Sequence, residues 1–266
     1  CGSGTGQLTF TSTAGTGPFT IIYTENGGTN RTATGVVSGS AFTPFTSPVT
    51  GTTNYVLVSV TGANSCARTS GFTGGSTTLT INPIPTPTFT VSPAASVCVD
   101  ADATYTTQSG QTNYIWTVPG TQGTDYDIIS GDLSAASNTV TLHWHTIGNK
   151  TVTVGYTTTG CASVTSASST TTIIKTERGV VHGGTHICAG SPSPLLTLND
   201  YVGTIVRWDY AEAIPYVWQT INHTADTYQP GILTTSTSYR AVIKNGTCPE
   251  DYALETRIDV EPKPVT

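Results

Sequence analysis

Methionine is absent from the 266 residues, and charged side chains make up only 10% of them, against about 25% in an ordinary soluble domain. The ten Lys and Arg residues form no cluster and the formal net charge is −6, which excludes a basic nucleic-acid-binding surface. No apolar run approaches the roughly 18 residues of a membrane span. Because methionine is missing and the sequence starts at Cys1, we expect a mature or excised piece of a longer chain.

Hydroxylated residues dominate what is present. The sequence holds 56 Thr and 23 Ser, with 28 Gly and 15 Pro. Threonine is β-branched and suits exposed strand faces, whereas the strong helix formers Ala, Leu, Glu and Lys are scarce. This composition excludes a long helical protein and predicts an all-β fold.

Six cysteines occur at wide and regular intervals. An even number suggests disulfides and an oxidising compartment, and no close pair of the C-x-x-C type indicates a metal site. The members of consecutive pairs are 65, 63 and 60 residues apart, so we predict one bond within each of three domains; six buried free thiols are the alternative. The predicted bonds are Cys1–Cys66, Cys98–Cys161 and Cys188–Cys248.

A repeat of roughly 90 residues follows from these intervals, which is the size of an immunoglobulin-like sandwich. A large aromatic residue lies about 20 residues after the first cysteine of each pair, and we expect it in the core. An alternating strand precedes each second cysteine, at 53–60, 150–156 and 237–244. The aromatic residues are Tyr23, Trp116 and Trp208.

Three tandem β-sandwiches are therefore predicted. The segment with Pro83, Pro85 and Pro87 marks the first junction, because proline cannot donate to a strand ladder. The second junction, near 175–180, has no proline. The predicted domains are 1–83, 84–175 and 176–262, with 263–266 as the start of a further linker. Hairpin turns are predicted at Glu25-Asn26-Gly27-Gly28 and at Asn245-Gly246.

Several stretches resemble repeats of giant Bacteroidota surface proteins, a family that includes SprB-like gliding-motility adhesins. Residues 218–228, with Asn-Gly-Thr-Cys248, resemble their Ig-like repeat. Tyr114-Ile-Trp116-Thr-Val-Pro-Gly, with Gly160-Cys161, is similar to their PKD-like repeat. Gly15-Thr-Gly-Pro-Phe19 looks like a third repeat type. The resemblance implies three Ig-like or PKD-like sandwiches of an adhesin that is exported by the type IX system to the cell surface.

Catalytic motifs are missing: the sequence has neither Gly-x-Ser-x-Gly nor His-Glu-x-x-His. We therefore predict a non-enzymatic protein without a cofactor. In His143-Trp144-His145 the two histidines share one strand face and could bind a metal or report pH. We favour the alternative, with Trp144 in the core and both histidines in solvent. Weak calcium candidates, against scattered solubilising acids, are Asp100, Asp102, Asp125 and Asp127.

The predicted function is a stalk segment of a large secreted adhesin at the bacterial cell surface, in adhesion and gliding motility. Its predicted partners are neighbouring repeats of the same parent chain and a surface polysaccharide or glycan, with no nucleic acid and no membrane span. The alternative is a glycan- or surface-binding accessory module of a secreted multidomain enzyme. A possible ligand face comprises Tyr216, Trp218 and Tyr228, although packing is the simpler interpretation of Trp218.

Overall fold

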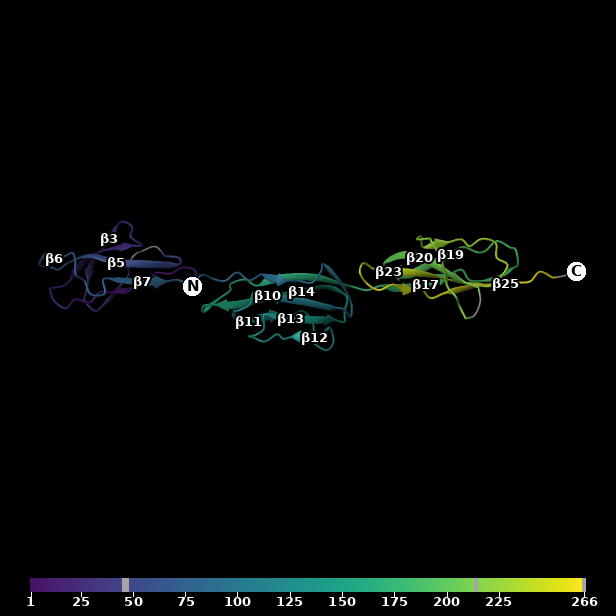
Figure 1. Ribbon diagram of the computed structural model, residues 1–266, viewed down its shortest axis with the longest axis horizontal. Coiled ribbons are helices and arrows are strands. Elements are labelled where there is room, and N and C mark those ends of the chain that lie inside the picture. The colour runs from purple at the N-terminus through teal and green to yellow at the C-terminus, as the bar shows by residue number, and fades with distance from the viewer. Residues whose placement is uncertain (45–47, 213–214, 265–266) are drawn as a thin grey trace. The chain divides into compact units, whose positions relative to one another are not determined.

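The computed structural model describes residues 1–44, 48–212 and 215–264 of the protein (Figure 1). These residues form no helix, and so none that is long and apolar enough to cross a membrane. The all-β prediction is confirmed. The sheets of the described residues fall into three consecutive sets of immunoglobulin-like sandwich strands. We call them repeat 1 (residues 8–80), repeat 2 (89–174) and repeat 3 (177–261).

The chain packs into two compact units that do not coincide with the three repeats. One unit holds Cys1–Pro87 together with Gly110–Asn113 and Gly155–Ser166. The other holds Thr88–Ser109, Tyr114–Val154 and Ala167–Thr266. Two loops of repeat 2 therefore pack with repeat 1.

Repeat 1 is built around its longest strand, β5 (Thr52–Thr61), which pairs with three others. Thr52 lies opposite Thr80, so β5 starts beside the end of β7 and finishes at the opposite end of the sandwich. The small sheet pairs β1 (Leu8–Thr9) with β4 (Ala41–Phe42). The large sheet has the order β3 (Asn30–Val36), β2 (Phe19–Glu25), β5, β6 (Ala67–Arg68), with β7 (Ser76–Thr80) also on β5.

Repeat 2 has a four-stranded and a five-stranded sheet. Its longest strand, β14 (Gly148–Thr158), starts with Gly148 opposite Ile173. The short strand β9 runs parallel to the last strand and sets Cys98 beside Ile174. One sheet has the order β12 (Tyr126–Gly131), β13 (Thr139–Trp144), β10 (Asp102–Thr107), β8 (Phe89–Val91). The other has the order β11 (Thr112–Thr117), β14, β16 (Ala167–Ile174), β9 (Ser96–Cys98), with β15 (Cys161–Ala162) on β14.

Repeat 3 repeats this plan. Its long strand β23 (Thr237–Lys244) starts with Thr237 opposite Ile258, and the parallel strand β18 sets Cys188 beside Glu261. One sheet has the order β17 (Glu177–His182), β19 (Leu196–Val202), β22 (Thr227–Tyr228). The other has the order β18 (His186–Cys188), β25 (Thr256–Glu261), β23, β20 (Thr204–Ala211), β21 (Gln219–Ile221), with β24 (Asp251–Tyr252) on β23.

Alternation of apolar and polar residues explains which faces are buried. Along β13, Val140, Leu142 and Trp144 are fully buried, and the residues between them are half-buried. The predicted core aromatics are confirmed, since Tyr23, Trp116 and Trp208 are 3%, 9% and 0% exposed. Each of these aromatic side chains is therefore part of the core of its repeat; Tyr23 and Trp208 lie on inner strands, whereas Trp116 lies on the edge strand β11.

The predicted strands are confirmed, and the predicted hairpins are confirmed in one case. The three alternating segments are β5, β14 and β23. Asn26 and Gly27 turn with positive φ between β2 and β3, as predicted. The two-residue hairpin at Asn245-Gly246 is wrong: Ile243 lies opposite Asp251, so the loop is longer. This longer loop contains Cys248.

Candidate functional site

The two disulfides join cysteines of neighbouring repeats. Cys1 is bonded to Cys161 and Cys98 to Cys248, with Cα–Cα distances of 5.6 and 5.3 Å, within the ordinary range. Cys66 and Cys188 are free and exposed. The three predicted bonds within domains are therefore wrong. Disulfides persist in oxidising surroundings, so the two bonds indicate a compartment outside the cytoplasm.

The length of the long strand explains this correction. Cys1 lies beside Asn82, just after β7, whereas Cys66 lies in the turn after β5, at the other end of repeat 1 (Figure 1). The ten residues of β5 rise by about 3.3 Å each, which separates its ends by about 30 Å. A disulfide needs Cα atoms within about 7 Å. Each first cysteine therefore lies out of reach of the second cysteine in its own repeat.

The first junction is centred on the carbonyl oxygen of Asn82. This oxygen accepts a 2.7 Å hydrogen bond from the N–H of Gly2. It also lies 3.7 Å from the Sγ atom of Cys161. The side-chain amide of Asn82 donates a 2.9 Å hydrogen bond to the carbonyl of Thr159. One residue thus contacts both sides of the Cys1–Cys161 bond.

The second junction has the same geometry around Ile174. Its carbonyl oxygen accepts a 2.8 Å hydrogen bond from the N–H of Val99 and lies 3.7 Å from the Sγ atom of Cys248. Further hydrogen bonds tie the linker to the cysteine loop: Asn245 Nδ2 donates to the carbonyl of Lys175, and Thr176 Oγ1 donates to the carbonyl of Pro249, at 2.9 and 3.0 Å. A disulfide and a hydrogen-bonded linker therefore restrain this joint together.

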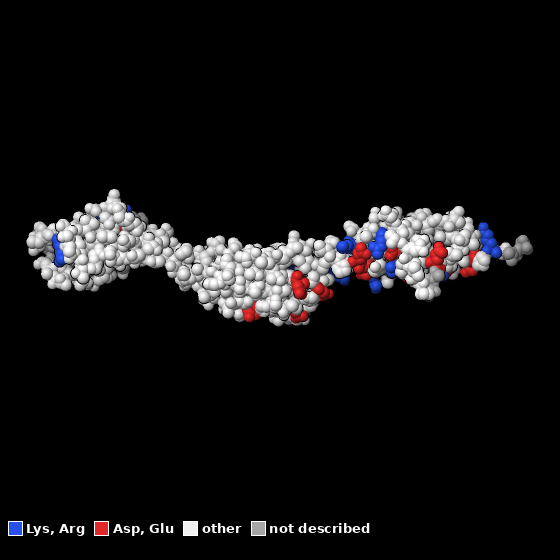
Figure 2. Space-filling model, viewed as in Figure 1, with Lys and Arg blue, Asp and Glu red and all other residues white. Residues whose placement is uncertain are grey.

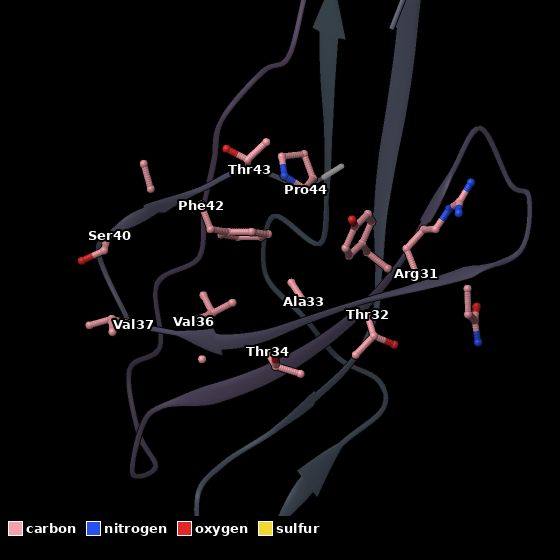
Figure 3. A pocket seen from close by; sticks show the side chains of 14 residues that line it. Arg31, Thr32, Ala33, Thr34, Val36, Val37, Ser40, Phe42, Thr43 and Pro44 are labelled. Atoms are coloured by element: carbon pink, nitrogen blue, oxygen red, sulfur yellow. The ribbon is translucent and has the colours of Figure 1, made fainter. Parts of the chain in front are cut away.

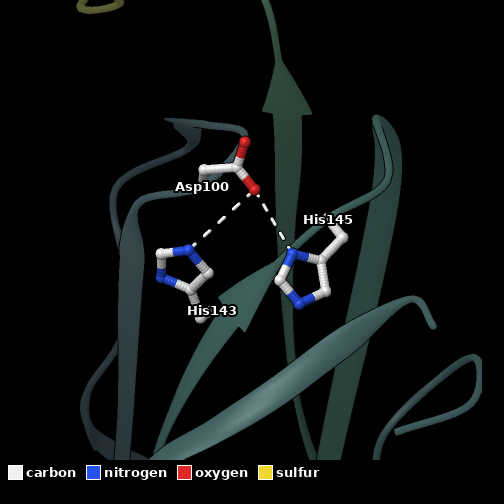
Figure 4. Close-up of side chains that lie close together, drawn as sticks. All are labelled: Asp100, His143 and His145. Atoms are coloured by element: carbon white, nitrogen blue, oxygen red, sulfur yellow. Dashed lines mark hydrogen bonds and ion pairs between the residues drawn. The ribbon is translucent and has the colours of Figure 1, made fainter. Parts of the chain in front are cut away.

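A second cluster of chemically active side chains lies on repeat 2. His143 and His145 project from one face of β13, and Asp100 lies between them in the turn after β9 (Figure 4). The Oδ1 atom of Asp100 is 3.2 Å from His145 Nδ1 and 3.9 Å from His143 Nε2. The N–H of Asp100 donates a 2.9 Å hydrogen bond to the carbonyl of Trp144, which fixes the turn beside the histidines.

Two further carboxylates hold the other ring nitrogens. His143 Nδ1 is 2.8 Å from Asp102 Oδ1, and His145 Nε2 is 3.0 Å from Asp127 Oδ2. Hydrogen bonds to Asp127 and then Asp100 raise the pKa of His145 above its ordinary value. The sequence analysis placed Trp144 in the core and the histidines outside, and the structure confirms this arrangement: Trp144 is 0% exposed and the histidines are part-exposed.

Asp125 takes no part in this cluster. Its carboxylate accepts hydrogen bonds from the N–H of Thr121 and from Thr146 Oγ1, at 2.8 and 3.2 Å. The Thr121 bond is the main cause that lowers the pKa of Asp125. The structure thus brings Asp100, Asp102 and Asp127 together with the histidines, and gives Asp125 a role in its own loop.

The possible ligand face of repeat 3 is divided. The rings of Tyr216 and Trp218 are 5.3 Å apart, and the guanidinium of Arg240 stacks 4.0 Å from the Trp218 ring. Tyr228 instead packs against the core, with its ring 5.6 Å from that of Trp208. Two of the three side chains therefore share one surface.

Repeat 1 carries a shallow hollow between β3 and the strand of Phe42 (Figure 3). Phe42 lies over Ala33 and Val36, and hydroxyl side chains line the rim. A second hollow, between the two sheets, is lined by aromatic and hydroxyl side chains that include Phe10 and Phe72. Among the described residues, neither hollow brings a nucleophile together with a histidine or carboxylate base.

A family model described as a domain of unknown function (DUF8696) matches residues 177–262, about a third of the chain. No curated protein matches. The I-band fragment I67-I69 from titin is 14% identical, with a TM-score of 0.48, and the match covers 98% of this chain and 93% of that one. InvD of Yersinia pseudotuberculosis is 12% identical, with a TM-score of 0.34 and coverage of 95% and 90%. SGBP-B of Bacteroides ovatus, solved with a mixed-linkage heptasaccharide, is 14% identical, with a TM-score of 0.22 and coverage of 92% and 60%.

Proposed function

We propose that this chain is a non-enzymatic stalk segment of a large secreted bacterial adhesin, which acts in surface adhesion and gliding motility. The observation that carries the proposal is the pair of bonds between neighbouring repeats, Cys1–Cys161 and Cys98–Cys248. A cross-link between two domains stabilises them and also adds a covalent path from one domain to the next. A protein that transmits force along a series of domains gains joints that cannot separate.

The junctions support this role. At Asn82 and at Ile174 the same carbonyl is hydrogen-bonded to one repeat and touches the cysteine of the next. Other hydrogen bonds cross each junction, from Asn82 Nδ2 to the carbonyl of Thr159 and from Asn245 Nδ2 to that of Lys175, so rotation there would break them and strain the disulfide. The linkers therefore restrict bending, as a stalk that presents a distant tip requires. The resemblance to SprB-like adhesins agrees with this interpretation.

The surface is suited to a long exposed segment. Figure 2 shows broad areas without charged side chains. The sequence has 56 Thr and 23 Ser, whose hydroxyls are polar groups without charge. Residues 1–83 hold only Glu25, Arg31 and Arg68 as charged groups. Solubility that depends on hydroxyl groups changes little with pH or salt. Such a surface fits a protein exposed to the medium.

The alternative function, a glycan-binding accessory module, depends on Tyr216 and Trp218. Sugar binding uses the open face of an aromatic ring, but Arg240 occupies one face of Trp218. A glycan array with the Trp218→Ala variant as control separates the two functions. Saturable binding that the substitution abolishes would favour the binding module.

The stalk proposal is tested on living cells of the bacterium that produces the chain. Antibodies raised against residues 1–266 are added to intact cells and followed by fluorescence. We expect surface labelling that moves along the cell and adhesion that the antibodies reduce. Labelling that appears only after the cells are permeabilised would refute the proposal.

A further inference from the structure

Each of the two free cysteines occupies the same position in its repeat as a bonded cysteine does in another repeat. Cys188 ends β18 beside Glu261, just as Cys98 ends β9 beside Ile174. The residue after each first cysteine donates its N–H to the last residue of the exit strand: Ala189 to Glu261 at 2.9 Å, and Val99 to Ile174 at 2.8 Å. Cys188 therefore has the same backbone pairing as the first cysteine of a junction, but no partner cysteine.

Cys66 occupies the position that the second cysteine of a bond between repeats takes. It lies a few residues after the long strand of its repeat, as do Cys161 and Cys248. Cys161 and Cys248 are 1% and 2% exposed and touch the linker carbonyls of Asn82 and Ile174, whereas Cys66 is exposed. An unpaired exposed thiol in an oxidising compartment points to a partner in another polypeptide segment.

In both bonds described above, the first cysteine of one repeat is joined to the second cysteine of the next repeat. We propose that Cys66 and Cys188 are bonded to further immunoglobulin-like repeats in the same order. Cys188 receives a cysteine from the turn after a long strand of a following repeat. Cys66 receives the cysteine that ends a short parallel strand of a preceding repeat. In each case two thiols lose two electrons and two protons to the compartment's thiol–disulfide oxidant. This proposal rests on the proposed stalk function.

The test uses the parent protein taken from cells, denatured in iodoacetamide without reductant and then digested. We expect both thiols to escape alkylation, and each to be recovered in a peptide linked to a cysteine outside residues 1–266. Alkylated Cys66 and Cys188 beside intact Cys1–Cys161 and Cys98–Cys248 bonds would overturn the proposal. That result would leave surface labelling, and so the stalk function, unaffected.

A second measurement uses the isolated chain, which carries an unpaired second cysteine in repeat 1 (Cys66) and an unpaired first cysteine in repeat 3 (Cys188). In a glutathione redox buffer at high protein concentration, we expect Cys66 of one copy to bond to Cys188 of another in excess over both homotypic links. The variants Cys66→Ser and Cys188→Ser are expected to abolish this product. Equal yields of all three links would count against a specific head-to-tail surface.

An independent observation concerns the cluster around Asp100. The ring nitrogens that do not contact Asp102 or Asp127, His143 Nε2 and His145 Nδ1, face Asp100 Oδ1, and the three atoms lie within 4.8 Å of one another. Ligands of a tetrahedral Zn²⁺ ion, at about 2.0–2.1 Å from the metal, lie roughly 3.3 Å apart. A small adjustment of side chains brings all three atoms into that range.

The outer carboxylates complete the pattern of a metal centre. Metal-binding histidines usually donate their second N–H to a carboxylate, which fixes the ring orientation and the tautomer. Asp102 and Asp127 provide this contact at 2.8 and 3.0 Å. We infer that Asp100, His143 and His145 bind a divalent transition-metal ion of the Zn²⁺ class. Imidazole ligands favour such an ion over Ca²⁺, which takes oxygen ligands.

Calorimetric titration of the folded chain with Zn²⁺ alone tests the site, after Cys66 and Cys188 have been alkylated so that thiolates do not compete. We expect one ion per chain, and binding at least tenfold weaker in His143→Ala and His145→Ala. Asp102→Asn is expected to weaken binding by 10- to 100-fold. His182→Ala, on repeat 3, is the matched control. Equal affinity in all four variants, or no saturable binding, would overturn the inference.

Discussion

Breaking one disulfide should lengthen the stretched chain by an amount that the bond pattern fixes. With both bonds intact, a load applied at Cys1 crosses to Cys161, follows the backbone to Cys98 and crosses to Cys248. The other two backbone segments between the bonds, 1–98 and 161–248, are longer and remain slack. The segment 98–161 therefore limits the extension.

The lengths follow from the residue numbers. The segment from Cys98 to Cys161 is 63 residues long, or about 220 Å at about 3.5 Å per residue. With both bonds reduced, the path from Cys1 to Cys248 is 247 residues, or about 860 Å. In Cys161→Ser the load takes the 97 residues from Cys1 to Cys98, or about 340 Å.

Single-molecule stretching of the chain from its two ends measures these lengths. We expect a roughly fourfold gain in extension between Cys1 and Cys248 on reduction, and a gain of about 120 Å in Cys161→Ser. Cys66→Ser is the matched control and should change nothing, because Cys66 is free. If Cys1 were bonded to Cys66 instead, Cys66→Ser would release the chain of about 65 residues between them. A longer extension of this variant would therefore refute the reasoning.

Three further predictions concern the stability of repeat 3. Trp208→Ala should lower the free energy of unfolding in urea by about 3–5 kcal/mol, because Trp208 is 0% exposed; a loss below about 1 kcal/mol would contradict this role. Arg240→Ala should lower it by roughly 1–3 kcal/mol, because Arg240 donates two hydrogen bonds to the buried carboxylate of Asp209; an unchanged urea midpoint would contradict this. Burial raises the pKa of Tyr239 to about 12, so its contribution to stability should be complete below pH 10 and lost as the pH rises towards 12. Absorbance of tyrosinate at 295 nm monitors this loss, and Tyr239→Phe should shift alkaline unfolding to higher pH.

The core could be predicted from the sequence because its signals are local. Alternation along residues 237–244 identifies Tyr239, Ala241 and Ile243 as core residues of β23, although Ser238 and Val242 on the other face are buried as well. The recurring aromatic at Tyr23, Trp116 and Trp208 marks a buried position in each repeat. The disulfides could not be predicted from spacing alone, because spacing does not tell which end of a sandwich a cysteine occupies. Counting the strand reversals between Cys1 and Cys66 would have shown that they lie at opposite ends.

The histidine cluster could be predicted only in part. The pattern His143-Trp144-His145 shows that two imidazoles share a face, but their carboxylate neighbours depend on sheet order. Asp127 reaches His145 because β12 lies beside β13, and Asp100 does so through its hydrogen bond to the carbonyl of Trp144. These are contacts across the fold, and no local pattern encodes them.

The pairing across repeats also dictates an order of assembly. Cys1 must wait for a partner 160 residues further along the chain, and Cys98 for one 150 residues further along. In the meantime the folded repeat 1 keeps Cys1 away from Cys66, because β5 separates them by about 30 Å. The length of β5 thus prevents the incorrect Cys1–Cys66 bond while Cys1 is still unpaired. Each of these two bonds can therefore close only when the following repeat, which carries the partner cysteine, is in place.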